Sequence, residues 1–275
     1  MQISLNIDIG IREIRQLTGF LKDKYGVDYS DYALTSFKRR VENYLISNKY
    51  GMETLFKKLE SKEFVDHFIG RIAVGVTELF RDPTFWILLK NIYLANIFKE
   101  NAKPRIWLPM CASGEEFYSL AILLKENGWA DNAEIFVSSM SNESLEAMQR
   151  GWMDPEKLEV SSKNYSRFQG ATQLTDYFKK IGNDIAFDRS LFARTKFFKE
   201  GLEFNNELPP IHLILFRNQL IYFNSTLQYK VCDVLYNRMA VRGLLALGIL
   251  EEIDVNVNTK FTVLNKAESI YQRKL

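Results

Sequence analysis

Cysteine and histidine are scarce in this sequence, and their scarcity argues against several kinds of site. Among 275 residues there are two cysteines and two histidines. Cys111 and Cys232 are far apart and both sit in apolar runs, so we expect buried, reduced thiols rather than a disulfide framework. Neither His67 nor His212 has another histidine or a cysteine at metal-ligand spacing, so we predict no metal site.

Long apolar runs and a strong net charge are also missing. No stretch reaches the ~18 uninterrupted apolar residues that a membrane helix needs. The N-terminus contains acidic residues and lacks a cationic start before an apolar block, unlike a secretory signal. We therefore expect a cytoplasmic protein with no membrane insertion. The formal net charge of +2 is too small to predict a nucleic-acid partner, so any electrostatic recognition must be local.

The N-terminal part of the sequence has a helical pattern of apolar residues. Residues 1–73 carry apolar residues at helical spacing, which predicts a small all-α N-terminal domain. A linker is expected at residues 74–84. The second helix of this domain has an apolar stripe on one side. Its other side carries three basic residues, Lys38, Arg39 and Arg40.

Beyond the linker, short apolar runs alternate with helical patterns. Over residues 85–275 this alternation predicts an α/β domain with a parallel, doubly wound sheet, in which ligands bind at the carboxyl ends of strands. The expected strands are residues 105–110, 135–138, 211–216 and 243–250, and the expected helices are residues 85–99, 117–126, 144–150 and 227–239. Residues 164–184 show the least pattern, and we interpret them as a loop with short helices.

The segment RIWLPMCASGEEFYSLAIL, residues 105–123, is the sharpest local signal. It predicts a strand, a turn of small residues, and a helix that begins near Gly114 and aims free amide groups at a ligand. A glycine at that position permits close approach of the backbone. Glu115 and Glu116 are also ordinary residues for a first helical turn, so the spacing alone favours simple helix initiation.

Three segments, in order, resemble signatures of the CheR-type chemotaxis receptor methyltransferases. They are the segment just described, VTELFRDPTFW at residues 76–86, and LILFRNQLIYF at residues 213–223. The resemblance covers the chain from about residue 14 to residue 253. It implies a Rossmann-like methyltransferase domain that uses S-adenosylmethionine and transfers its methyl group to glutamate carboxylates of chemoreceptor helices.

The resemblance also implies roles for individual residues. It assigns Thr77, Arg81, Gly114, Glu116, Ser139 and Asn218 to cofactor binding, and Arg81 and Tyr222 to the catalytic centre. An arginine can fork onto the methionine carboxylate, and a glutamate can accept from its ammonium group. Because a glutamate substrate is already an anion at neutral pH, methyl transfer depends on alignment rather than on an acid or base. Two simpler interpretations stay open: Arg81 as an ion-pair partner of Asp82, and Tyr222 as a core side chain.

Several positions depart from the family pattern, and most of them belong to the cofactor pocket. Gly75 replaces an asparagine, Met110 replaces a small residue of the turn, Ser139 stands near the place of an acidic ribose-binding residue, Lys196 replaces an asparagine or aspartate, and residues 248–251 read Gly-Ile-Leu-Glu instead of Gly-His-Ser-Glu. A hydrogen bond to a charged group contributes ~1.5–3 kcal/mol, so the loss at the ribose alone weakens binding roughly tenfold to a hundredfold.

These departures leave three hypotheses. The first is a divergent but active protein-glutamate methyltransferase that binds S-adenosylmethionine weakly. The second is a catalytically degenerate CheR-like interaction module in bacterial signalling. The third is a methyltransferase of small molecules, for which we expect an enclosed pocket with no groove to the N-terminal helices.

The partner expected from the resemblance is a helical signalling protein. Lys38, Arg39 and Arg40 are the proposed contacts, although such a run is also typical of a solvated helix face. Family members that tether to a receptor tail use a Gly-x-Gly-x-Arg segment in a small β subdomain. Residues 167–188 contain only Gly170 and Gly182, so we do not expect tethering by that route.

Overall fold

The computed structural model describes residues 8–73, 77–182, 184–253 and 257–274, and Gly75 lies outside them. The first described part is a group of four helices. These are α1 (Ile11–Tyr25), α2 (Leu34–Asn48), α3 (Met52–Lys58) and α4 (Lys62–Ile72). Gly26 ends α1 with a φ of 70°, a left-handed conformation that glycine adopts easily. The apolar faces of these helices bury side chains such as Leu17, Phe37 and Phe68 against one another.

The second part is built on a seven-stranded sheet with the order β6-β2-β1-β7-β8-β10-β9. Its strands are β1 (Arg105–Leu108), β2 (Glu134–Ser139), β6 (Thr195–Lys199), β7 (Ile211–Leu215), β8 (Met239–Ala246), β9 (Phe261–Asn265) and β10 (Ile270–Arg273). Neighbours from β6 to β8 are parallel, whereas β10 is antiparallel to both β8 and β9. The predicted doubly wound α/β fold is confirmed, with one antiparallel strand near its edge.

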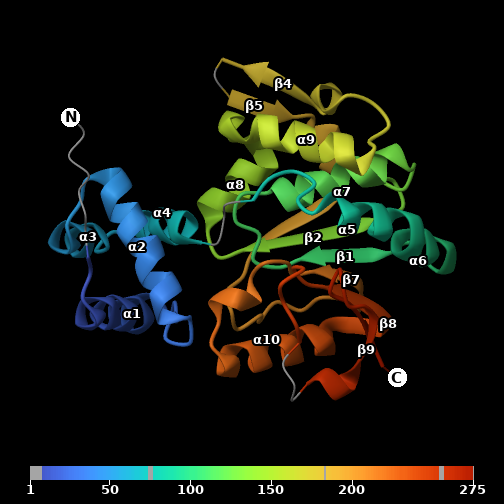
Figure 1. The fold of residues 1–275 in the computed structure, drawn as a ribbon. Coiled ribbons are helices and arrows are strands. Elements are labelled where there is room, and N and C mark those ends of the chain that lie inside the picture. Colours follow the sequence, from blue (N-terminus) through green and yellow to red (C-terminus); the bar gives the residue numbers. More distant parts are fainter. Residues whose placement is uncertain (1–7, 74–76, 183, 254–256, 275) are drawn as a thin grey trace.

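Helices cover both faces of this sheet (Figure 1). One face carries α7 (Glu115–Glu126), α8 (Asn142–Arg150) and α9 (Leu158–Phe168), and the other carries α10 (Ser225–Arg238). The side chains of β1 alternate accordingly, because Ile106 and Leu108 pack with the buried residues of α7, whereas Trp107 packs with those of α10. The expected helix at residues 85–99 is formed by α5 (Pro83–Leu88), a π-helical turn (Leu89–Leu94) and α6 (Ala95–Glu100).

A second, small sheet corrects one prediction. Residues 164–184 are not mainly loop, because they contain the end of α9 and the strand β4 (Phe178–Ile181). This strand pairs with β5 (Asp184–Phe187), which also pairs with β3 (Trp152–Met153), all antiparallel. The strands are so short that few side chains in them are buried, so no alternating pattern emerges from the sequence.

The strand expected at residues 243–250 is also displaced. It begins at Met239, directly after α10, and ends at Ala246. Val241 and Arg242 near its start are exposed, so the apolar run that marks the strand in the sequence begins too late. Gly248 then lies in a turn whose backbone is bound by the Glu251 carboxylate.

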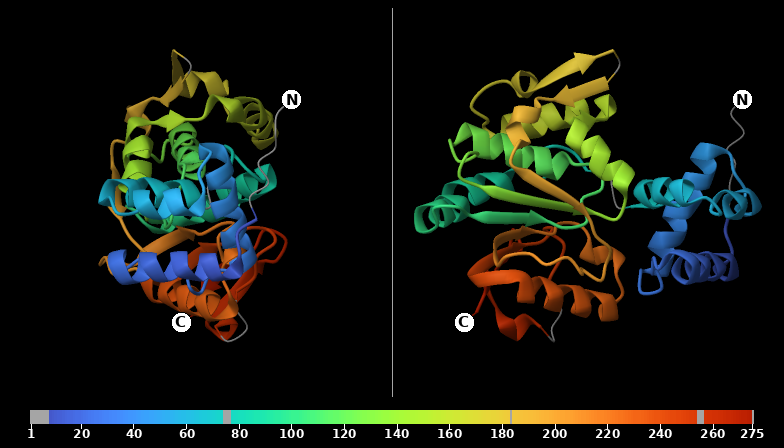
Figure 2. Two further views of the ribbon diagram at one scale, coloured as in Figure 1. Left: turned by 90° about the vertical axis from the view of Figure 1, so that its left-hand side faces the viewer. Right: turned by 180° about the vertical axis from the view of Figure 1, so that it is seen from behind.

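The helical region and the α/β region are joined by a continuous apolar core. The rings of Tyr32 and Phe223 lie 5.0 Å apart, and the Ala33 amide donates to the carbonyl oxygen of Tyr222 at 2.8 Å. Figure 2 shows the four helices as a body beside the larger α/β region. No helix among the described residues is both long and apolar enough to cross a membrane.

Candidate functional site

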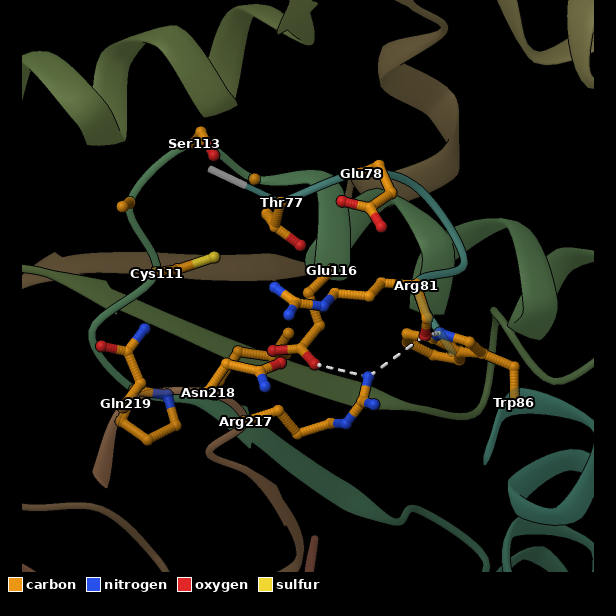
Figure 3. Close-up of a pocket in the computed structure, with 14 residues that line it drawn as sticks. Thr77, Glu78, Arg81, Trp86, Cys111, Ser113, Glu116, Arg217, Asn218 and Gln219 are labelled. Carbon is orange, nitrogen blue, oxygen red and sulfur yellow. Dashed lines mark hydrogen bonds and ion pairs between the residues drawn. The ribbon is translucent and has the colours of Figure 1, made fainter. Parts of the chain in front are cut away.

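The segment that links the two regions is fixed through its backbone. The Phe80 amide donates to Ser119 Oγ at 2.8 Å, and the Arg81 carbonyl oxygen accepts from Trp86 Nε1 at 2.9 Å. Phe80 and Asp82 have φ values of 51° and 56°, a left-handed conformation that is strained for such residues. The backbone is thus held in an uncommon shape that leaves the Arg81 side chain extended across a pocket (Figure 3).

The turn after β1 forms another wall of this pocket. Gly114 has a φ of 94°, and a Cβ atom there would lie 2.8 Å from Met148 Cγ and 3.1 Å from a ring carbon of Tyr118. Glycine is therefore required by the backbone conformation and by packing against α8. Close approach of a ligand, which the sequence suggested as the reason, is not needed to explain it. Gly114 nevertheless lines the pocket, and α7 begins directly after it.

A buried arginine closes the far side of the pocket. Arg217 follows β7, and its side chain is only 2% exposed. Its Nη2 lies 2.7 Å from an Asp82 carboxylate oxygen, and its Nη1 lies 3.4 Å from Glu116 Oε1. Its guanidinium carbon lies 4.0 Å from the centre of the Phe85 ring. Burial raises the pKa of Glu116, and the charge of Arg217 opposes that rise.

The sequence interpretation missed Arg217, and the alternative that it left open paired Arg81 rather than Arg217 with Asp82. A cation inside the apolar run LILFRNQLIYF is a usable signal, because a buried charge needs a partner. Among the described residues, no ion pair involves the Arg81 side chain, so the simpler interpretation of an ion pair between Arg81 and Asp82 is wrong.

A second missed residue, Glu251, fixes the turn that carries Asn218. Its carboxylate accepts from the backbone amides of Asn218 and Gly248, both at 2.7 Å, and of Ile221 at 3.1 Å. Burial raises the pKa of Glu251, whereas these amide donors lower it. Asn218 has a left-handed φ of 58°, and the three hydrogen bonds hold it there. Glu251 is thus a positioning residue at the edge of the pocket.

The walls enclose a cavity of about 50 Å³ (Figure 3). Five of the residues assigned from the sequence line it: Thr77, Arg81, Gly114, Glu116 and Asn218. A guanidinium, a carboxylate and an amide facing one space suit a zwitterion such as the amino-acid end of S-adenosylmethionine. A single water occupies about 10–15 Å³ by this measure, so the cavity takes a small head group and not a whole nucleoside.

Ser139 lies elsewhere, at the carboxyl end of β2. It lines a separate cavity of only about 10 Å³ together with Met110 and Met140. Met110 is 8% exposed and packs in the core shared with the helical region. The position where we expected ribose is therefore filled by side chains of the protein. The amino-acid half of the expected cofactor fits this structure, and the adenosine half fits beside Ser139 only if side chains that line this cavity, such as Met110 and Met140, move.

One carboxylate of the helical region holds this closed end in place. Asp66 of α4 accepts from Ser141 Oγ at 3.0 Å and from the backbone amides of Asn142 and Glu143 at 3.1 and 3.0 Å. Lys199 Nζ lies 2.6 Å from the same carboxylate. Asp66 thus caps the first turn of α8 from across the interface between the two regions.

Tyr222 lines a larger groove of about 510 Å³ between α2 and the α/β region. Arg81 and Asn218 line both this groove and the small cavity, so the two spaces adjoin. The groove is polar and strongly basic. Its lining includes the arginines Arg39, Arg40, Arg71 and Arg81.

The basic trio of α2 is divided by the helix geometry. Successive residues of a helix point about 100° apart, so three in a row cannot share one face. Lys38 points away from the groove and lies 2.5 Å from Asp8. Arg39 and Arg40 line the groove, and the Arg40 guanidinium carbon lies between the rings of Tyr32 and Tyr222, at 5.3 and 5.1 Å from their centres.

Comparison with known proteins identifies the family. Residues 75–270 match the family described as "CheR methyltransferase, SAM binding domain". The "Putative methyltransferase Cher3" of Pseudomonas putida is 27% identical over 98% of both chains. A "Chemotaxis protein methyltransferase" of Listeria monocytogenes is 26% identical over 86% of this chain and 88% of its own, and one of Borreliella burgdorferi is 23% identical over 94% and 95%. The chain belongs to the CheR methyltransferase family.

Proposed function

We propose that this protein transfers methyl groups from S-adenosylmethionine to glutamate carboxylates on the helices of a signalling protein, with cytoplasmic helices of chemoreceptors as the first candidates. The observation that carries the proposal is the continuity of two spaces. An arginine-lined groove that suits acidic side chains meets the zwitterion cavity at Arg81 and Asn218. The names of the Listeria and Borreliella relatives support the chemotaxis assignment.

The pocket side chains divide the binding of the cofactor between them. S-adenosylmethionine, when bound, supplies a methyl group on a positively charged sulfur. Glu116 accepts from its ammonium group, and Arg81 donates to its carboxylate. Arg217 acts behind Glu116, where its charge opposes the rise in the pKa of Glu116 that burial causes. Thr77 and Asn218 complete the polar lining.

The groove side chains act on the other substrate. Arg39 attracts a glutamate carboxylate and favours its ionised form, which is the nucleophile. Arg40 adds its charge from a buried position, where its Nη1 donates to the Ile72 carbonyl oxygen at 2.9 Å. Tyr222, on the opposite wall, is held by the Ala33 amide at its carbonyl oxygen and limits how the substrate enters. No general base is needed, so the rate depends on how well the two substrates are aligned. The open groove favours a protein substrate over a small molecule.

Met110 and Met140 set the expected strength of cofactor binding. Both line the place where adenosine would lie, and a methionine side chain can take other rotamers. Binding must then displace buried side chains, which costs roughly 1.5–3 kcal/mol for each that is fully exposed. We therefore expect weak binding rather than none.

Calorimetric titration with S-adenosylhomocysteine tests the proposal. We expect binding in the native protein, loss of binding in Arg81→Ala, and no change in Val263→Ser, a substitution on the distant strand β9. Methyl incorporation from labelled cofactor into a purified receptor signalling fragment tests the substrate. Absence of binding at millimolar ligand would remove the proposal.

The closed adenosine end supports a second candidate, a CheR-like interaction module without catalysis. In that case the groove alone carries function. Charge reversal at Arg39 would then abolish signalling in cells, whereas Glu116→Ala would be silent. The same titration separates the two candidates, because the module predicts no heat with S-adenosylhomocysteine.

A further inference from the structure

We propose that Lys157 is a positioning residue for the cofactor, because through the Glu115 carboxylate it holds the turn of residues 112–114 that borders the small cavity. This inference rests on the proposed function, since it concerns the place where the amino-acid end of S-adenosylmethionine binds. Lys157 ends the 3₁₀ turn Pro155–Lys157, which follows β3 of the small sheet. It therefore lies outside the three motifs that supply the described lining of the cavity.

The ion pair between Lys157 and Glu115 is buried. Lys157 Nζ lies 2.5 Å from Glu115 Oε1, and the two side chains are 19% and 1% exposed. Water screens such a pair only weakly, so the attraction keeps both side chains in one geometry. The backbone of Lys157 is also fixed, since its amide donates to the Asp154 carbonyl oxygen at 3.2 Å. A buried ion pair is weak evidence for stability, so we look for its role in what it holds in place.

The second oxygen of the Glu115 carboxylate holds the turn. Glu115 Oε2 accepts a hydrogen bond from Ser113 Oγ, and Ser113 lines the cavity together with Ala112 and Gly114. Figure 3 shows Ser113 on the turn that borders the pocket. One carboxylate thus connects Lys157 on one side with the cavity wall on the other.

The middle of the turn lies between two points that are fixed by the backbone. The Cys111 amide donates to the Ser138 carbonyl oxygen at 2.7 Å, and the Gly114 carbonyl oxygen accepts from the Tyr118 amide at 2.8 Å. Gly114 has a φ of 94°, and a glycine has more backbone conformations available than other residues. A side-chain contact at Ser113 therefore restricts the shape of the cavity wall between these two points.

Glu115 and Glu116 have different tasks although they are adjacent in the sequence. Successive residues of a helix point about 100° apart, so Glu116 lines the cavity while Glu115 faces Lys157. Burial raises the pKa of the Cys111 thiol in the turn, and the charges of Glu116 and Glu115 raise it further. Both negative charges therefore act at the cavity wall. Lys157 balances the charge of Glu115, which would otherwise repel the carboxylate of the cofactor.

Calorimetric titration of the whole protein with S-adenosylhomocysteine tests the inference. Lys157→Met removes the cation and releases the turn, so we expect the dissociation constant to rise about tenfold, the effect of one lost charge-assisted hydrogen bond. Lys157→Arg keeps a cation and should bind within about threefold of the native protein. Lys163→Met is the matched control, because its ion pair with Glu159 is exposed on α9, and it should bind like the native protein.

A second variant breaks the same link at its other end. Ser113→Ala removes the hydrogen bond to Glu115 and leaves the ion pair intact, so it creates no unpaired buried charge. We expect the dissociation constant to rise about fivefold. The double variant with Lys157→Met should bind no more weakly than Lys157→Met alone, because both changes remove one link. If the two losses multiply instead, Ser113 and Lys157 act independently and the inference is wrong.

Hydrogen exchange follows the turn without any ligand. In Lys157→Met the amides of residues 110–114 should exchange about tenfold faster than in the native protein, because the turn opens locally. The amides of the central strand β8 should exchange at the native rate. This comparison separates a positioning role from a global loss of stability, which would accelerate exchange in both segments.

The contrary outcomes are equally specific. The inference is overturned if Lys157→Met keeps the native affinity, if Lys157→Arg does not restore it, or if exchange in the turn is unchanged. Failure of the proposed function gives a different pattern. In that case the native protein binds no S-adenosylhomocysteine, whereas the turn still exchanges faster in Lys157→Met.

Discussion

The two ends of the cofactor crevice differ in how they are built. The end at Glu116 and Arg217 consists of charged groups with defined partners, at 3.4 Å between these two residues and at 2.7 Å between Arg217 and Asp82. The end at Met110 is a cavity of about 10 Å³ whose lining among the described residues contains no charged side chain and includes Met110, Met140 and Ile69. Loss of one partner from a charged network leaves another charge unpaired and destabilises the protein. An apolar pocket can be filled by a larger side chain without leaving any group unpaired.

This difference teaches which features of a binding site persist when a sequence diverges. Arg217 is bound to two carboxylates and stacked on Phe85, so removal of one partner destabilises the others. Within the part of the chain that the structure describes, the Ser139 hydroxyl has no charged partner, and it accepts a long hydrogen bond from the Ser141 amide at 3.5 Å. The charged end is therefore part of the fold, and the apolar end is free to change.

The largest effect is expected from removal of Arg217, the cation at the charged end. Arg217→Met should leave the half-buried carboxylates of Asp82 and Glu116 without their shared cation. It should lower the free energy of unfolding by about 3 kcal/mol, the low end for a broken buried ion pair. Urea denaturation measures this loss. Arg194→Met, which affects an exposed ion pair to Asp131 at 3.9 Å, is the control and should have an effect within about 0.5 kcal/mol. Equal effects would show that the charged end is not structural.

Substitution of Glu116 tests whether the charged end binds the cofactor. Glu116→Gln keeps the size of the side chain and removes its charge, so the ammonium group loses its charged acceptor. We expect the dissociation constant for S-adenosylhomocysteine to rise roughly tenfold to a hundredfold, about 1.5–3 kcal/mol. Calorimetry measures it. An unchanged constant would mean that the ligand does not use the Glu116 end.

Opening the apolar end should have the opposite effect. Met110 has a φ of 56°, a conformation that glycine adopts without strain. Met110→Gly should tighten S-adenosylhomocysteine binding about tenfold, because a buried side chain worth ~1.5–3 kcal/mol no longer has to be displaced. Titration with free methionine, which reaches only the charged end, should give the same result in both proteins. No gain in affinity would show that Met110 does not oppose the nucleoside.

The contribution of the Asp66 contacts to the free energy of unfolding should depend on pH. The amide donors and Lys199 lower the pKa of Asp66 in the folded protein. A depressed folded pKa stabilises the protein fully above the unfolded value of about 3.9, and the contribution is lost as the pH falls through the folded pKa. Asp66→Asn should therefore cost about 1 kcal/mol near neutral pH. In urea denaturation the difference between the two proteins should begin to shrink below about pH 4 and continue to shrink as the pH falls through the folded pKa of Asp66. A difference that does not shrink with falling pH would contradict this account.

The sequence indicates which of the predicted site residues line one pocket, although it misses Arg217, because the predicted residues sit in local motifs. Thr77 and Arg81 belong to one segment, Glu116 to a strand-turn-helix unit and Asn218 to a strand end, and parallel strands bring their carboxyl ends to one edge. The doubly wound sheet follows from the alternation of strands and helices. The sequence also shows that Met110 is unusual, because it is a bulky residue in a turn otherwise made of small residues.

The remaining features depend on contacts between distant segments. Asp66 meets the start of α8 only because the helical region docks at the carboxyl end of β2, and no periodicity in the sequence reports that docking. The division of Lys38 from Arg39 and Arg40 depends on the rotation of α2 relative to the groove. The β4 and β5 strands are too short to produce a pattern.

The backbone at Met110 has a consequence for how this site can change. Met110 has a left-handed backbone conformation, which a methionine side chain does not favour. The next residue is held by a hydrogen bond from the Cys111 amide to the Ser138 carbonyl oxygen at 2.7 Å. The main chain at Met110 thus has a conformation that glycine would adopt without strain. A small residue at position 110 would fit this backbone without refolding of the loop, so a single substitution can remove one of the side chains that fill this end.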